Sequence, residues 1–170
     1  KLGRELAKAS SGQRSVQAPT WFSDALPNVG FPVGVTELCS LYGLGGSTFV
    51  AAQTIASAQA EVQVHCCWVD PESSLHAPGL MQQGVDLKRL LVVRPERARF
   101  KSVAVRIARS GAMAVMVIDF HPVGVRRGTP PKSGMEEERW IRRLQLACEE
   151  GGTAVLLLTD ERAKGSVLPV

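Results

Sequence analysis

The stretch VTELCSLYGLGGSTFV, residues 35–50, decides the fold, because an apolar strand runs into glycines and a helix then begins at Ser47. This order is typical of a phosphate-binding loop, in which four residues separate two glycines and a lysine with a serine or threonine follows. Here Gly43 and Gly46 enclose only two residues, and Ser47 stands at the lysine position. Thr48 keeps the hydroxyl that would face magnesium. The missing cation favours a binding or scaffolding protein over an ATPase.

The composition indicates one globular core. The chain has 170 residues, of which 45% are hydrophobic, and a net charge of +4. Eight of its 20 lysines and arginines lie within residues 88–109, which fits either an anionic partner or a solvated helix face. The four cysteines (Cys39, Cys66, Cys67 and Cys148) lack a C-x-x-C spacing. We therefore expect reduced thiols, buried where the runs are apolar, in a soluble cytoplasmic protein without a signal peptide or membrane span.

The fold class follows from the alternation of apolar runs and amphipathic segments after residue 35. Helices are expected at 47–60, around 74–83, at 97–110 and up to the glycines at 151–152, and strands at 35–42, 62–69, 90–93, 112–120 and 153–158. Alternating strands and helices predict an α/β fold with a mostly parallel sheet. Continuous apolar runs predict that these are central strands, covered by helices on both faces.

The N-terminal segment differs from this core. Residues 1–19 predict a weakly helical arm, with Leu2 and Leu6 at helical spacing, and a polar linker. Trp21 and Phe22 follow in a turn-rich segment, where they would join the core or dock on a neighbouring subunit. Residues 20–170 are expected to form the core, and 164–170 resemble the start of a further strand, which predicts a C-terminally truncated domain.

Four acidic residues lie at or just after the ends of predicted strands: Asp70, Glu72, Asp119 and Asp160. The carboxyl ends of parallel strands meet at one edge of a sheet, so these side chains are expected to share a crevice with Gly43, Gly45, Gly46, Ser47 and Thr48. In a nucleotide hydrolase Asp119 would hold magnesium through water and Glu72 would activate the attacking water. The alternative is that these carboxylates only stabilise strand ends and loops.

A basic loop lies at 121–134, where Arg126, Arg127 and Lys132 could contact the phosphates of single-stranded DNA. The loop has no aromatic side chain for base stacking, which weakens that interpretation. The histidines (His65, His76 and His121) are isolated in the sequence. His65 is expected in the core, and no metal site is predicted.

With these residues assembled, the chain resembles bacterial RecA, and more closely the ImuA family of RecA-like proteins of inducible mutagenesis. The resemblance rests on residues 20–37, on CWVDPE at 67–72 with GVDLKRLL at 84–91, and on VMVID at 115–119. It implies a RecA-like three-layer sandwich with a degenerate phosphate loop. Asp160 stands where RecA has a nucleotide-sensing glutamine.

The resemblance to ImuA implies an adaptor rather than an enzyme. Such a protein would assemble ImuB and an error-prone polymerase for translesion synthesis, without a cofactor or with only weak ATP binding. RecA, a second copy of the chain and single-stranded DNA are further expected partners. Two alternatives stay open: a weak ATPase in which Arg126 or Arg127 replaces the lysine, and an SOS-induced cell-division inhibitor that binds FtsZ.

Overall fold

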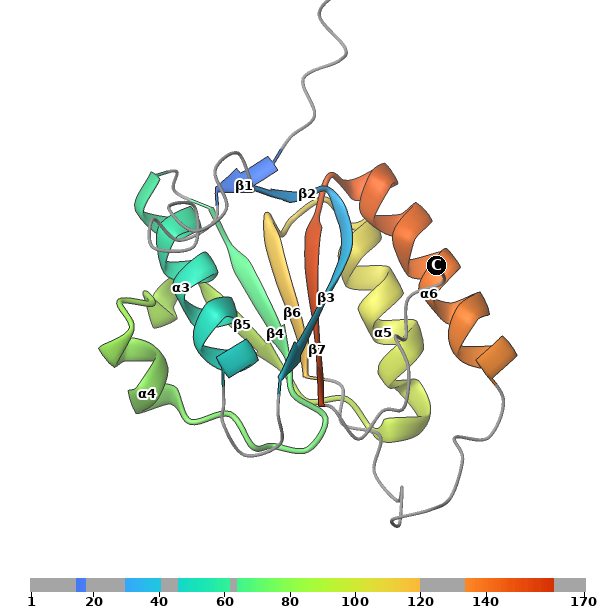
Figure 1. Ribbon diagram of the computed structural model, residues 1–170, viewed down its shortest axis with the longest axis horizontal. Helices are drawn as coiled ribbons and strands as arrows, with labels where there is room; N and C mark the ends of the chain where they lie inside the picture. The colour runs from blue at the N-terminus through green and yellow to red at the C-terminus, as the bar shows by residue number, and fades with distance from the viewer. Residues whose placement is uncertain (1–14, 18–29, 41–45, 62–63, 120–133, 161–170) are drawn as a thin grey trace, which may run out of the picture.

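A five-stranded parallel sheet organises the protein, whose computed structural model describes residues 15–17, 30–40, 46–61, 64–119 and 134–160. The strand order is β3-β7-β6-β4-β5. The strands are β3 (Gly34–Ser40), β4 (Cys66–Val69), β5 (Leu90–Val93), β6 (Val115–Asp119) and β7 (Ala154–Asp160). Helices cover both faces of the sheet and make three layers (Figure 1). The predicted three-layer α/β fold with a parallel sheet is therefore confirmed.

The helices are divided between the two faces. In Figure 1, α3 (Gly46–Glu61) and α4 (Ala77–Gln82) lie on one side of the sheet, and α5 (Arg97–Arg109) and α6 (Gly134–Gly151) lie on the other. A short 3-10 helix, η1 (Leu87–Arg89), leads into β5. An antiparallel pair of β1 (Ser15–Gln17) and β2 (Gly30–Pro32), which the sequence did not predict, lies at the amino-terminal edge of the sheet. None of the described helices is long and apolar enough to cross a bilayer.

Each strand contributes to two cores, because successive side chains point to opposite faces. On β4, Trp68 belongs to the core beneath α3 and Cys67 to the core beneath α5 and α6. On β6, Val117 and Met116 divide in the same way. Strands buried on both faces must be apolar at every position, which explains the continuous runs seen in the sequence.

The helices α5 and α6 are joined by apolar contacts and by polar contacts at both ends. The rings of Phe100 and Trp140 are 5.4 Å apart between centroids, and Trp140 Nε1 donates to the Lys101 carbonyl oxygen at 3.2 Å. At the other end Arg109 Nε lies 2.6 Å from Glu150 Oε2. A side chain on Gly151 would overlap the carbonyl oxygen of Ala108, so only glycine fits this approach.

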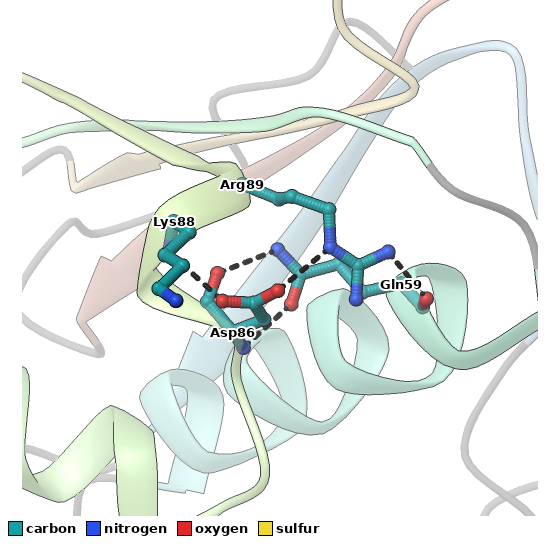
Figure 2. A network of polar contacts seen from close by, with 4 residues as sticks. All are labelled: Gln59, Asp86, Lys88 and Arg89. Atoms are coloured by element: carbon teal, nitrogen blue, oxygen red, sulfur yellow. Dashed lines mark hydrogen bonds and ion pairs between the residues drawn. The ribbon is translucent and has the colours of Figure 1, made fainter.

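The opposite face uses a buried amide to hold a loop. The Gln59 side chain, 3% exposed on α3, accepts from the Asp86 backbone N–H at 2.9 Å and donates to the Asp86 carbonyl oxygen at 3.1 Å. Arg89 completes the network through its bonds to the Asp86 carboxylate and the Gln59 carbonyl oxygen (Figure 2). The hydrogen bond from Arg89 lowers the pKa of Asp86 below its usual value.

Several sequence predictions were wrong in detail. The predicted central strands β3 and β5 are the edge strands of the described sheet, and on β5 Leu91 is 47% and Val92 39% exposed. His65 is exposed just before β4 and does not enter the core. Cys39 is also exposed, because it lies on the edge strand β3.

The other cysteines are buried, as expected. Burial raises the pKa of the Cys66 thiol to about 11 and those of Cys67 and Cys148 to about 12. These thiols stay protonated and unreactive near neutral pH.

Several element boundaries also differ from the prediction, and strand β4 starts at Cys66 rather than at residue 62. Helix α4 starts at Ala77 rather than near residue 74, because His76 Nδ1 accepts from the Gly79 N–H and caps the helix at that point. Strand β6 starts at Val115 rather than at residue 112, and Ala112 is exposed.

Candidate functional site

The site is built at the carboxyl ends of the strands, where Asp70 follows β4. Its carboxylate is fully buried. Oδ1 accepts from the Ser74 N–H at 2.9 Å, and Oδ2 accepts from the Leu75 N–H at 3.2 Å and from Arg94 Nε at 3.2 Å. Asp70 therefore holds the turn after β4 through two backbone N–H groups.

Ser74 brings two of the predicted acids together. Asp119, the last residue of β6, is 8% exposed, and its Oδ2 lies 3.2 Å from Ser74 Oγ. The same hydroxyl lies 3.4 Å from Asp70 Oδ1. A hydroxyl has one proton, so Ser74 can donate to only one of these carboxylates at a time. Ser74 was not among the predicted site residues, although an aspartate before a Pro-x-Ser-Ser turn is a recognisable signal for such a contact.

Glu72 does not join this pair. Its carboxylate lies 2.7 Å from Nη2 of Arg97, at the start of α5. The turn that carries it is constrained, because the next residue, Ser73, has a φ of 58°, in the left-handed region. To act as a general base, Glu72 would first have to leave the guanidinium group of Arg97. Neither Arg94 nor Arg97 was among the predicted site residues, because their partners are distant in the chain.

Two hydroxyls meet at the phosphate-loop position. Ser40 ends β3, Ser47 is in the first turn of α3, and their Oγ atoms are 3.0 Å apart. Thr48 is exposed, and the space around Gly46 is open. Ser40 pairs in register with Asp160 of β7, so Asp160 ends its strand beside this hydroxyl contact.

The remaining predicted site residues cannot be compared with the structure. Gly43 and Gly45, the basic residues Arg126, Arg127 and Lys132, and the arm residues Leu2, Leu6, Trp21 and Phe22 lie outside the described residues.

The chemistry of this arrangement is limited. The first turn of α3 presents backbone N–H groups that favour an anion. The side chain of Arg94, which forms an ion pair with Asp70, is 53% exposed. Within the described ranges no group of three or more His, Cys, Asp or Glu residues could hold a metal ion.

Comparison with known proteins identifies the relatives of this fold. Residues 7–136 match the RecA N-terminal domain. The chain is 37% identical over 93 residues to Protein RecA of Sulfurovum sp. (strain NBC37-1). This alignment covers 53% of the chain but only 26% of that RecA protein, so the chain spans a minor part of the relative's length.

Solved structures share the fold at lower identity. The RadB recombinase gives a TM-score of 0.64 at 19% identity, over 81% of this chain and 66% of RadB. SulA from Pseudomonas aeruginosa gives 0.55 at 19% identity, over 74% of this chain and 97% of SulA. These likenesses concern the fold alone, whereas the domain match covers most of the sequence. The chain belongs to the RecA N-terminal domain family.

Proposed function

We propose that this chain is a non-catalytic, ImuA-like adaptor of an SOS-inducible mutasome. In that role it assembles ImuB and an error-prone polymerase on damaged DNA and needs no nucleotide cofactor. The observation that carries the proposal is the hydroxyl contact between Ser40 and Ser47, at the position where a nucleotide-binding loop has its lysine.

The missing ammonium group matters because a charge-assisted hydrogen bond is worth about 1.5–3 kcal/mol in binding. Buried Asp119 ends β6 at the same end of the sheet and adds negative charge that disfavours a triphosphate, whereas Arg94 offsets the charge of Asp70. The ion pair between Glu72 and Arg97 further removes the residue that would activate water. Both observations support an assembly role with little or no ATP turnover.

ATP hydrolysis tests the non-catalytic part of the proposal. We expect no turnover by the wild-type protein with magnesium and ATP, and at most weak ATP binding by thermal shift. Glu72→Gln and the matched variant Glu96→Gln, at an exposed acid before α5, are assayed in parallel. Turnover that Glu72→Gln abolishes and Glu96→Gln leaves intact would mean that the protein is a weak ATPase of the RecA family.

Partner capture tests the adaptor part. The full-length protein, immobilised, is offered ImuB, the error-prone polymerase, RecA and FtsZ separately. We expect retention of ImuB and the polymerase. Retention of FtsZ without the polymerase partners would favour the cell-division inhibitor instead.

A further inference from the structure

The outer face of α6 carries a stripe of arginines with a leucine, here called the α6 stripe. It consists of Arg139, Arg142, Arg143 and Leu146, at the spacing i, i+3, i+4 and i+7 that places side chains on one side of a helix. All four are exposed, and Leu146 is 56% exposed. The buried side chains of the helix (Trp140, Ile141, Leu144, Ala147 and Cys148) define the opposite side.

The three arginines have no ion pair with any residue that the structure describes. Other carboxylates of α6 are already engaged: Glu136 and Glu137 contact Lys101, Glu149 accepts from Gln145, and Glu150 contacts Arg109. Glu138 is exposed and offsets part of the charge. The stripe therefore has an excess of positive charge.

The basic residues of α5 and of the segment before it behave differently. Arg94 and Arg97 contact Asp70 and Glu72, and Lys101 and Arg109 contact α6. Only Arg106 on α5 resembles the α6 stripe, because it is exposed and no described residue forms an ion pair with it. Most of the basic cluster at 88–109 is thus used in internal ion pairs. Among the described residues, most of the basic side chains without an ion pair lie on α6.

The chemistry of the stripe favours a protein over a nucleic acid. Proteins that bind single-stranded nucleic acid commonly combine a basic groove with exposed aromatic rings on which the bases stack. Trp140, the one aromatic residue in the sequence of α6, is buried, so this helix offers the basic part alone. Every basic residue of α6 is an arginine and none is a lysine. Arginine is enriched at protein interfaces, where its planar guanidinium pairs with carboxylates.

Leu146 supplies the apolar part of the surface. The methylene groups of the neighbouring arginines extend that apolar strip while their charged ends stay in water. We propose that the α6 stripe docks an acidic amphipathic helix of a partner protein. Carboxylates one turn apart on that helix pair with the arginines, and an apolar side chain between them packs on Leu146.

This proposal shares one element with the proposed function, namely that the partner is a protein. The residues of the α6 stripe are not those of the phosphate-loop region. The probe is a fluorescein-labelled 20-residue helical peptide of glutamate, alanine and leucine, with the leucines on one face. Binding to the full-length protein is measured by fluorescence anisotropy at low and at physiological salt. We expect salt-dependent binding, because exposed charge pairs are screened.

Variants locate the contact. Arg139→Glu/Arg142→Glu/Arg143→Glu should weaken peptide binding about tenfold or more, since each exposed pair contributes a modest amount. Leu146→Ala should weaken it about threefold. The matched control Arg106→Glu, on α5, should leave binding unchanged. Circular dichroism checks that every variant remains folded.

Three results would overturn the docking site: no peptide binding at low salt, equal binding by the triple variant, or equal weakening by Arg106→Glu. A 20-nucleotide single-stranded oligonucleotide is assayed beside the peptide. If the triple variant loses only the oligonucleotide and Leu146→Ala affects neither probe, the stripe is a nucleic-acid surface.

The two proposals can fail separately. If the triple variant still captures the polymerase partners, the docking site is wrong and the adaptor stands. If the wild-type protein binds the peptide but captures no polymerase partner, the adaptor is wrong and the docking site stands.

Discussion

The two faces of the sheet both have an apolar core and differ in the polar contacts that lie beside it. Between α5, α6 and the sheet, large apolar side chains such as Phe100, Trp140 and Leu144 fill the core, and ion pairs such as Arg109–Glu150 remain in solvent. Around α3 and α4, buried polar side chains such as Gln59 and Asp70 hold loops through their backbone groups.

The difference means that contacts on one face act mainly on stability, whereas contacts on the other face also position the candidate site. Apolar contacts on the α5–α6 face have no preferred direction. Their loss lowers the free energy of unfolding without displacing any one polar group. Each buried polar contact on the other face orients one loop, and its loss leaves backbone groups unpaired. The candidate site, with Asp70, Ser74 and Asp119, depends on contacts of this second kind.

The largest expected effect is on the α5–α6 face. Trp140→Ala should lower the free energy of unfolding by about 3–5 kcal/mol, because it opens a cavity beside Phe100 and removes the hydrogen bond to Lys101. Urea denaturation measures the loss. The control Leu146→Ala, on the exposed side of the same helix, should change it by less than about 1 kcal/mol. Equal losses would contradict the division of α6 into a buried and an exposed side.

The next effect tests a buried carboxylate on the α3–α4 side. Asp70→Ala leaves the N–H groups of Ser74 and Leu75 without their acceptor, so we expect a loss of about 3 kcal/mol. Asp70→Asn retains one acceptor oxygen and should lose less. Chemical denaturation gives both values. A loss below about 1 kcal/mol for Asp70→Ala would mean that the turn does not depend on this carboxylate.

A smaller effect is expected from the amide that holds η1. Gln59→Ala removes the bonds to the Asp86 N–H and carbonyl oxygen, and should lower the unfolding free energy by about 2 kcal/mol. Hydrogen exchange should be faster at Asp86, whose N–H loses its acceptor. Gln82→Ala, at an exposed position of α4, is the control and should change neither quantity.

The smallest effect concerns acid pH. Because the folded pKa of Asp86 lies below the unfolded value of 3.8, its stabilising contribution is full above that pH and is lost as the pH falls through the folded pKa. Stability below about pH 4 should therefore fall less steeply in Asp86→Asn than in the wild type. Arg89→Leu removes the main cause of the shift and should flatten the curve in the same direction. If plots of unfolding free energy against pH were parallel for all three proteins, Asp86 would not be the source of the pH dependence.

The sequence predicted the fold better than the site. Strands β4, β6 and β7 were located to within a few residues, because strands buried on both faces leave continuous apolar runs. The same signal failed for β3 and β5, since an apolar run does not reveal which strands stand at the edges. Strand order depends on pairing between segments far apart in the chain.

For the site, the sequence located the acids but not their partners. Asp70 and Asp119 do meet at the strand ends, as parallel strands require. Glu72 was expected beside them, but Arg97, which is distant in the sequence, draws its carboxylate toward α5. No local motif encodes such a pairing. Ser74 could have been found, because its contact to Asp70 is short-range.

The close approach at Gly151 restricts how this protein can change over generations. The Ala108 carbonyl oxygen occupies the space that a side chain at position 151 would need. No other residue fits there unless α5 and α6 move apart. Position 46 has open space around it and can vary freely without steric conflict. A saturation library should therefore return glycine alone at 151 and several small residues at 46.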